Sequence, residues 1–324
     1  MDPLAGYRLR APIPADLDGV AAVLAADDLD DAGQVVLDVG FVRDQWGRTD
    51  FELAVDAWVV DDRAGTVVGY GQVTRDEDDV VESWGVVHPE HRGRGLGSAL
   101  LDRIEERAPR LLSGVRPLRF RHAIDAGDRA AAALLSARGL RPVRHFWHMA
   151  IESTEASESG PSPSGVQVAT IQAPGDLPAV HAVLDAAFAE HWDHRPEPFE
   201  RWVEDLTQGP SYDPTLWLLA RLHGKPVGAL TAVVLLEHGW ISLLGVLAPF
   251  RGRGIAAALL RHSFATFGAR GVGRVQLAVD AENPATTLYE REGMSVVKRW
   301  DLWERIIGGP DPTDPAAAGP ASTR

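Results

Sequence analysis

One turn decides the fold of this chain: Val246-Leu247-Ala248-Pro249-Phe250-Arg251-Gly252-Arg253-Gly254-Ile255-Ala256 joins an apolar strand to an apolar helix. Gly252 and Gly254 carry no Cβ that would keep an anion away from the backbone. Several peptide N–H groups can therefore converge on one phosphate at the positive end of the helix dipole. The turn lacks the Gly-Lys-Ser/Thr ending of a Walker loop and the glycine spacing of a dinucleotide-binding fold. It predicts a phosphate-binding strand–turn–helix of a different kind.

The same arrangement occurs earlier in the chain, in His88-Pro89-Glu90-His91-Arg92-Gly93-Arg94-Gly95-Leu96-Gly97. Arg92-Gly93-Arg94-Gly95 precedes Arg251-Gly252-Arg253-Gly254 by 159 residues. Other matched pairs follow in the same order at nearly the same offset: Pro14-Ala15-Asp16-Leu17 with Pro174-Gly175-Asp176-Leu177, Trp58 with Trp217, Gly69 with Gly228, and Gly139 with Gly293. Several features in one order at a nearly constant offset indicate a duplication.

Two stretches are too poor in apolar side chains to form a core. Residues 152–164 are rich in Ser, Glu and Pro and predict a linker, and residues 308–324 predict a disordered tail. They delimit an N-terminal domain, 1–151, and a C-terminal domain, 165–307. Each begins with a short strand and an amphipathic helix, continues with paired strands, and then enters the glycine turn and a second helix. This order predicts an α/β (α+β layered) fold, with a mixed central sheet flanked by helices in each domain.

Composition narrows the class of protein. A length of 324 residues suits two cores, and the formal net charge of -14 opposes binding to nucleic acid. No segment is apolar and long enough to span a membrane, and the N-terminus shows no signal-peptide core, so we expect a cytoplasmic protein. Cysteine is absent, which excludes disulfides and a cysteine nucleophile.

The pattern Arg-Xaa-Xaa-Gly-Xaa-Gly/Ala between a strand and a helix resembles the acyl-CoA pyrophosphate loop of the GNAT superfamily of N-acetyltransferases. The resemblance covers nearly all of both halves and implies acetyl-CoA as co-substrate. It also implies that the strand before the loop pairs with the pantetheine arm, and that its splayed end exposes an N–H that polarises the thioester carbonyl. The implied cofactor-binding positions are Leu244, Gly245, Val246, Arg251, Gly252, Arg253, Gly254, Ile255 and Ala256, and in the first half Gly85, Val86, Val87, Arg92, Gly93, Arg94, Gly95, Leu96 and Gly97.

The two halves differ near their ends. The second contains Asn283 and Tyr289 before Gly293, and the resemblance implies that Asn283 contacts the CoA arm while Tyr289 protonates the departing thiolate. Counting four residues back from Gly139 gives Leu135, which cannot donate a proton; Ser136 replaces it only if the helix is shifted. We therefore expect a catalytic C-terminal domain and a degenerate N-terminal domain that keeps the fold.

The acceptor side is less clear from the sequence. His191, Trp192 and His194 follow the first helix of the second half, where the family has a loop over the acceptor pocket. They are candidates for binding substrate, with surface packing as the alternative. Glu237 and His238 lie at a hairpin that an amine could approach, and a chain of water molecules could equally remove its proton. Two histidines without a third clear ligand do not predict a metal.

The sequence predicts acetyl transfer from acetyl-CoA to a primary amine by direct attack in a ternary complex. The acceptor is a small-molecule or peptide amine, and a homodimer is compatible with the sequence. Two alternatives stay open. The tandem plan also resembles mycothiol synthase, which acetylates a cysteinyl amine, although Trp240 stands where that family has a Glu. The other alternative is a non-catalytic acyl-CoA sensor, which would have no use for Tyr289.

Overall fold

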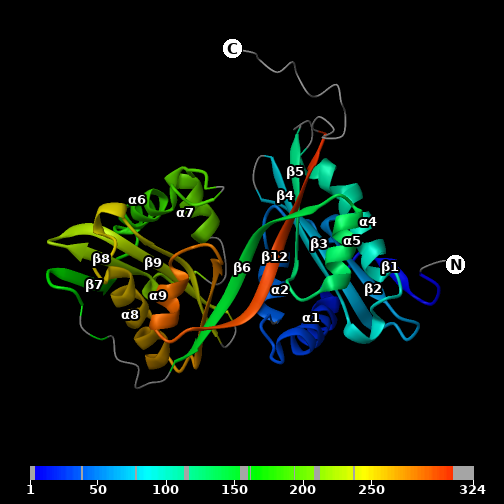
Figure 1. The fold of residues 1–324 in the computed structure, drawn as a ribbon, viewed down its shortest axis with the longest axis horizontal. Helices are drawn as coiled ribbons and strands as arrows, with labels where there is room; N and C mark the ends of the chain where they lie inside the picture. The colour runs from blue at the N-terminus through cyan, green and yellow to red at the C-terminus, as the bar shows by residue number, and fades with distance from the viewer. Residues whose placement is uncertain are drawn as a thin grey trace, which may run out of the picture. The chain divides into compact units, whose positions relative to one another are not determined.

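The computed structural model describes residues 4–37, 39–76, 79–112, 117–153, 160, 162–192, 194–207, 212–235 and 238–308. The chain forms two compact units. The N-terminal unit comprises Met1–His145 with the residues from Arg299 onward, and the C-terminal unit comprises Phe146–Lys298. Each unit has one mixed sheet with helices on both faces, so the predicted α/β layering is confirmed (Figure 1).

In the N-terminal unit the strands lie in the order β1-β2-β3-β4-β5-β12. Neighbouring strands are antiparallel except β4 and β5, which are parallel. The strands are β1 (Arg8–Arg10), β2 (Ala57–Asp61), β3 (Val67–Arg75), β4 (Val80–Val87), β5 (Leu118–Asp125) and β12 (Ser295–Ile307). The helices are α1 (Leu17–Ala32), α2 (Val39–Trp46), α3 (Leu53–Asp56), α4 (Leu96–Leu111) and α5 (Arg129–Ala137), with 3-10 turns at Pro14–Asp16 and Pro89–His91.

The C-terminal unit repeats this plan in the order β6-β11-β10-β9-β8-β7, with β10 and β11 as its parallel pair. Its strands are β6 (Arg141–Glu152), β7 (Val166–Thr170), β8 (Leu218–Leu222), β9 (Lys225–Leu235), β10 (His238–Val246) and β11 (Arg274–Asp280). Its helices are α6 (Leu177–Phe188), α7 (Phe199–Thr207), α8 (Ile255–Ala269) and α9 (Thr286–Arg291), with 3-10 turns at Pro214–Leu216 and Ala248–Phe250.

Two glycines of β10 show how closely the helices cover the C-terminal sheet. A Cβ at Gly239 would lie 2.8 Å from the Phe267 ring of α8, and a Cβ at Gly245 would lie 2.8 Å from Ala187 of α6. Both separations are below van der Waals contact, so these positions require glycine. Helix α8 therefore packs on one face of β10 and helix α6 on the other.

The last strand of each half completes the sheet of the other half. β12 pairs with β5 from Trp300↔Asp125 to Ile307↔Leu118, and β6 pairs with β11 from Phe146↔Asp280 to Glu152↔Arg274. The compact units therefore differ from the predicted domains, 1–151 and 165–307, which follow the sequence repeat. Strand propensity shows that each half ends in a strand, but it carries no information on which sheet that strand joins.

Of the predicted linker, residues 154–159 and 161 lie outside the described residues, as does the predicted tail beyond Gly308. Among the helices that the structure describes, none is both long and apolar enough to cross a membrane.

Candidate active site in the C-terminal unit

The parallel strands β10 and β11 are paired only at their beginning. Their ladder joins His238–Trp240 to Arg274–Gln276, and among the described residues it goes no further. On its other side β10 stays paired with β9 as far as Val246↔Gly228. The backbone of β10 beyond Trp240 therefore has one edge that β11 does not cover. Leu244, Gly245 and Val246, predicted to bind the cofactor, lie on this part of the strand.

A β-bulge interrupts the same strand just after the ladder ends. The register between β10 and β9 shifts between Ile241 and Leu243, which leaves Ser242 as the extra residue. A bulge takes backbone groups out of the regular ladder. In the N-terminal unit, β4 pairs with β3 without a shift from Gly69↔Val87 to Arg75↔Val81, so Gly85, Val86 and Val87 lie on a regular strand. Only the C-terminal copy thus has the local irregularity that can present an N–H to a ligand.

The glycine turn has the conformation that its sequence predicts. Gly252 and Gly254 have φ of 72° and 79°, which side chains rarely adopt. Helix α8 begins at Ile255, and Ala258 N–H is the first to bond back, to the Gly254 carbonyl at 3.0 Å. The N–H groups of Ile255 and Ala256 thus have no carbonyl to donate to. No atom lies within 4 Å of a Cβ placed on Gly252, while one placed on Gly254 would lie 3.4 Å from Pro163, so the turn is open to a ligand at Gly252.

The N-terminal turn is built in the same way. Gly93 and Gly95 have φ of 74° and 81°, and helix α4 begins at Leu96. Ala99 N–H is the first to bond back, to the Gly95 carbonyl, which leaves the N–H groups of Leu96 and Gly97 at the open helix end. The two turns therefore offer an anion the same set of amides.

The arginine that begins each loop motif holds the loop in place. In the C-terminal unit Arg251 donates to the Val246 carbonyl at 3.1 Å and the Ala187 carbonyl at 2.9 Å, and it pairs with Glu190 at 3.1 Å. These bonds tie the end of β10 to the end of α6. In the N-terminal unit Arg92 donates to the Val87 carbonyl and pairs with Asp27 at 2.6 Å and Asp30 at 2.8 Å.

The second loop arginine has a different position. Arg253 is exposed, lies over the Phe250 ring at 5.5 Å and donates to the Pro249 carbonyl. Its guanidinium forms no ion pair with a carboxylate among the described residues. Of the two arginines predicted to add charge at this turn, Arg253 is the one whose charge is not already paired.

Tyr289 on α9 is a buried phenol. Its side chain is 7% exposed, and desolvation raises the pKa of its hydroxyl to about 12. The hydroxyl has no hydrogen-bond partner within the part of the chain that the structure describes. Met294 N–H bonds to the Tyr289 carbonyl at 3.0 Å. A tyrosine is normally buried with its hydroxyl bonded, so this one is free to meet a ligand.

The counterpart of Tyr289 in the N-terminal unit is Leu135, as predicted. Leu140 N–H bonds to the Leu135 carbonyl at 3.0 Å, which repeats the bond that ends α9. Leu135 is 1% exposed and belongs to the apolar core. Ser136, the alternative from a shifted helix, is exposed to solvent. The N-terminal unit therefore has no proton donor at this position.

Asn283 and Asp128 occupy equivalent turns before α9 and α5. Asn283 Oδ1 accepts from Ala285 N–H at 2.9 Å, and Asp128 Oδ1 accepts from Ala130 and Ala131 N–H, both at 2.9 Å. The Asp128 side chain thus caps α5, whereas Asn283 closes a turn just before α9, whose N-cap residue is Ala285. Only Asn283 also carries an amide NH₂, which has no partner among the described residues. That group can donate to a carbonyl of a bound arm.

The side chains predicted on the acceptor side have different partners, although His194 N–H bonds to the His191 carbonyl at 3.2 Å. The His191 ring lies 4.4 Å from Phe188, and burial, followed by the charge of Arg251, lowers the pKa of its imidazole. His194 contacts Asp185 at 3.2 Å, while Trp192 is 38% exposed. These contacts do not bring the two histidines to a common ligand. Glu237 and Asp193 lie outside the described residues.

Among the described residues, one group of possible metal ligands occurs in the N-terminal unit, where His88, Glu90 and His91 place ligand atoms within 4.8 Å of one another. The Nδ1 atoms of both histidines already have partners. His88 Nδ1 accepts from Glu90 N–H at 3.3 Å, and His91 Nδ1 bonds with the Tyr7 hydroxyl at 3.0 Å. The group is thus explained by hydrogen bonds of the protein itself.

Sequence reasoning missed a polar group near the point where β10 and β11 stop pairing. His148 of the exchanged strand β6 bonds through Nε2 to Gln276 Oε1 at 3.0 Å, and its ring lies 5.0 Å from that of Trp240. Gln276 pairs with Trp240 in the ladder. His148 belongs to the first half of the sequence, so no motif of the second half could have indicated it.

Family models and known relatives match this chain. The model described as "Acetyltransferase (GNAT) family" matches residues 177–294, and that described as "Acetyltransferase (GNAT) domain" matches residues 54–135. The mycothiol acetyltransferase of Beutenbergia cavernae is 34% identical over 261 residues, which cover 74% of this chain and 80% of that protein. The chain belongs to the GNAT acetyltransferase family. A second GNAT relative, the mycothiol acetyltransferase of Streptomyces griseus, is 30% identical over 89% of this chain and 92% of its own length.

Solved GNAT structures give the same result. A GCN5-related N-acetyltransferase from Sphaerobacter thermophilus is 32% identical, with a TM-score of 0.82 over 95% of this chain and 97% of that one. A tandem GNAT protein from the clavulanic acid biosynthesis pathway, 18% identical with a TM-score of 0.68 over 94% of this chain and 99% of that one, shares the fold. The predictions of tandem GNAT domains and of an N-acetyltransferase that acts on an amine are confirmed. GNAT acetyltransferases use acetyl-CoA as donor.

Proposed function

We propose that the C-terminal unit carries the acetyltransferase site and that acetyl-CoA binds along the open edge of β10. The observation that carries this proposal is the buried phenol of Tyr289, whose hydroxyl has no hydrogen-bond partner among the described residues. In the same unit β10 has a bulge and one uncovered edge, and its glycine turn is open. The N-terminal unit shares the turn but has neither the phenol nor the bulge.

The residues present suit a coenzyme A arm. The open amides of Ile255 and Ala256 at the start of α8 would hold the diphosphate, with Arg253 as the nearby charge. The amide groups of the pantetheine arm would pair with the β10 backbone from Leu244 to Val246, and the Asn283 amide would donate to the arm. When bound, acetyl-CoA supplies a thioester whose carbonyl carbon the amine attacks. A backbone N–H freed by the bulge would stabilise negative charge on the carbonyl oxygen.

Tyr289 would donate its proton to the thiolate that leaves. Its raised pKa keeps the phenol protonated at neutral pH, which an acid requires. The amine attacks directly, so no side chain has to carry the acetyl group. Water can take the proton of the amine; Glu237, the side chain considered from the sequence, lies outside the described residues.

The acceptor is a primary amine on a small molecule or peptide. The mycothiol acetyltransferases among the relatives favour a second, narrower candidate, the cysteinyl amine of a mycothiol-type acceptor. Trp240 supports a different choice, because an indole beside His148 offers an acceptor an aromatic surface in place of a carboxylate. The proposed activity does not depend on which acceptor is used.

The test is release of free thiol from acetyl-CoA in the presence of a panel of amines that includes a cysteinyl amine. We expect turnover with at least one amine and saturable binding of coenzyme A. If turnover survives disruption of the C-terminal turn by Gly254→Val but is lost with Gly95→Val, the site lies in the N-terminal unit and the proposal is wrong. Absence of turnover across the panel would contradict the proposed acceptor class.

A further inference from the structure

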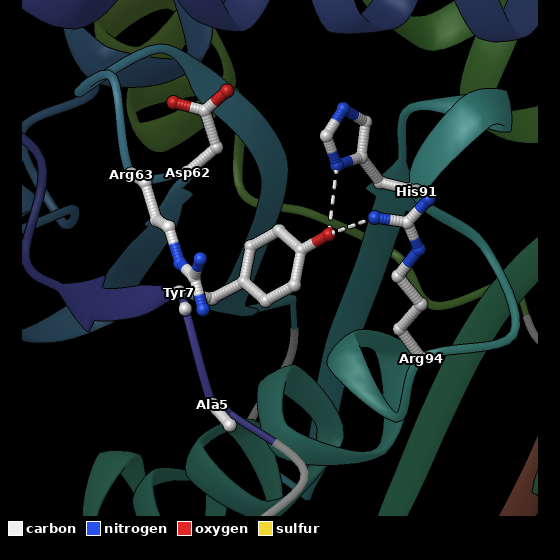
Figure 2. Close-up of a pocket in the computed structure, with 7 residues that line it drawn as sticks. Ala5, Tyr7, Asp62, Arg63, His91 and Arg94 are labelled. Carbon is white, nitrogen blue, oxygen red and sulfur yellow. Dashed lines mark hydrogen bonds between the residues drawn. The ribbon is translucent and has the colours of Figure 1, made fainter.

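The N-terminal unit contains a hollow of about 450 Å³ that the proposed acetyl transfer does not use (Figure 2). It lies where the start of the chain, the turn between β2 and β3, and the N-terminal glycine turn meet. Its lining residues are Ala5, Gly6, Tyr7, Asp62, Arg63, His91 and Arg94. Three segments that are distant in sequence thus contribute polar side chains to one concave surface.

The Tyr7 hydroxyl is the centre of a hydrogen-bond chain in this hollow. Arg94 donates through Nη1 to the Tyr7 oxygen, and the hydroxyl lies 3.0 Å from His91 Nδ1 (Figure 2). Because the arginine must be the donor in the first bond, the hydroxyl proton is available for His91 Nδ1. A neutral His91 then carries its proton on Nε2. The chain therefore presents an imidazole N–H donor as well as a guanidinium.

Arg63 lies against Gly6, on the side of the hollow opposite Arg94. A Cβ at Gly6 would lie 2.7 Å from Arg63 Nε, so the guanidinium lies directly against this glycine. In Figure 2 the Arg63 side chain is on the far side of the Tyr7 ring from Arg94. The two guanidinium groups thus flank one tyrosine.

Neither cation is neutralised by the protein. Within the described residues Arg63 and Arg94 form no ion pair with a carboxylate, although the whole chain has a formal net charge of -14. Asp62 is the one acidic residue of the lining, and its Oδ1 accepts from Ala64 N–H at 2.8 Å and Thr66 N–H at 2.9 Å. These bonds hold the carboxylate in its own turn. The hollow therefore offers hydrogen-bond donors with a net positive charge.

The equivalent arginine of the C-terminal turn shows that this arrangement is not a property of the repeat. Arg94 and Arg253 both donate to the carbonyl four residues earlier, of Glu90 and Pro249, but Arg253 also lies over the Phe250 ring, whereas Arg94 also donates to Tyr7. Phe250 stands where the N-terminal turn has His91. The N-terminal turn has a donor in place of an apolar ring, so its loop is equipped for a ligand that the C-terminal loop does not bind in this way.

We propose that this hollow binds a phosphate-type oxyanion. Two guanidinium groups and an imidazole N–H match the oxygens of a phosphate, and charge-assisted bonds from arginine are the strongest that a protein makes to this group. The site is independent of acetyl transfer by the C-terminal unit. The same phosphate chemistry could come from free inorganic phosphate or from the 3′-phosphate of coenzyme A held at the Gly93–Gly95 turn.

The test is calorimetric titration of the full chain with inorganic phosphate at constant ionic strength, with chloride as reference. We expect saturable binding that Arg63→Gln and Arg94→Gln each weaken about tenfold, which is the effect of losing one charge-assisted bond. Arg63→Lys should give an intermediate loss because it keeps the charge and loses the planar fork. Arg129→Gln is the matched control, since Arg129 is an exposed arginine of the same unit outside the hollow.

The source of the phosphate is distinguished by repeating the titration with coenzyme A and with its 3′-dephospho form. If the coenzyme supplies the phosphate, Arg63→Gln weakens binding of the first ligand and leaves the second unchanged. If free phosphate is the ligand, Arg63→Gln changes neither. Non-saturating heats with inorganic phosphate, or an equal loss in Arg129→Gln, would overturn the proposal. Unchanged melting temperatures of the variants exclude misfolding as the cause.

Discussion

The two units have the same glycine turn, yet they differ in the strand before it and at the position of the proposed acid. Both turns place glycines at positive φ and open a helix with unbonded amides. The C-terminal unit adds a bulge in β10 and a buried phenol, where the N-terminal unit has a regular β4 and Leu135. The comparison teaches that the turn belongs to the fold, while the chemistry proposed for the C-terminal unit uses two further features that the N-terminal unit lacks and still folds.

The residues around the parallel strand pair also differ between the two units. In the N-terminal unit Trp46 donates to the Tyr70 hydroxyl at 2.8 Å, and the Tyr70 and Trp84 rings lie 5.2 Å apart. Where β4 pairs with β5, the buried side chain of Arg121 bonds to Glu304 at 2.9 Å. The equivalent ladder position in the C-terminal unit is the neutral Gln276, bonded to His148. At this position the N-terminal unit thus has a charge pair, whereas the C-terminal unit has a hydrogen bond between His148 and Gln276.

The largest expected effect comes from Tyr289→Phe, which makes the C-terminal unit resemble the N-terminal one. We expect kcat to fall by about a thousandfold, within the range for loss of a general acid, while the Kd for coenzyme A stays the same. Thiol release and calorimetry measure the two quantities. In the parent protein kcat should not decline through loss of this acid between pH 7 and about 10, because the phenol has a pKa of about 12.

Tyr212→Phe is the matched control for that change, since it removes a hydroxyl from a partly buried tyrosine of the same unit. Equal activity losses in the two variants would show that Tyr289 acts through packing and is not the acid.

A second difference concerns His122 of β5, which is fully buried and whose pKa burial lowers to about 4. The unfolded chain binds a proton near pH 6.5 and the folded chain does not, so stability is present above pH 6.5 and is lost as pH falls toward 4. We expect the N-terminal unit to lose about 3 kcal/mol across this window, since a tenfold change in proton affinity corresponds to about 1.4 kcal/mol.

Urea unfolding at pH 7, 5.5 and 4 measures this loss. His122→Leu, which copies Leu277 at the equivalent ladder position of β11, should reduce the pH dependence. If the slope is the same in that variant, another group is responsible.

A smaller effect is expected from a change in β12, the strand that joins the sheet of the other half. Glu304→Gln removes a charge that pairs with Arg121, a side chain 3% exposed, and Glu82 at 3.7 Å compensates in part. We expect the free energy of unfolding to fall by about 2 kcal/mol, because a buried charge loses its partner. Glu106→Gln on α4, which breaks an exposed pair with Arg110, should cost less than 1 kcal/mol. Denaturant melts of the two variants compare them directly, and equal costs would mean that the exchanged strand is not anchored by this pair.

The smallest effect is expected at the turns. Gly252→Ala and Gly93→Ala both force a side chain into a left-handed conformation, at a cost of about 1 kcal/mol each, and neither added Cβ meets another atom within 4 Å. The two melting temperatures should therefore fall alike. The KM for acetyl-CoA should rise only in Gly252→Ala. A rise in both variants would show that the N-terminal turn also binds the substrate of the reaction.

Much of the candidate site could be predicted from the sequence, because it depends on local geometry. Positive φ at Gly252 and Gly254, the open start of α8, and the equivalence of Tyr289 with Leu135 follow from spacing within short segments. The role of Arg251 could not be predicted. Its bonds go to Ala187 and Glu190, which lie more than sixty residues earlier, and no local pattern indicates them.

The sequence by itself determined the duplication, the two glycine turns and the difference between the halves at Tyr289, since each follows from neighbouring residues and the periodicity of one element. Only the tertiary structure decided that β6 and β12 exchange sheets, that His148 therefore lies beside Trp240 and Gln276, and that Tyr7 and Arg63 meet the N-terminal turn. The physical reason is that strand pairing and side-chain contact are made across the sheet, between residues far apart in the chain. A strand has the same local sequence preferences whichever edge it joins.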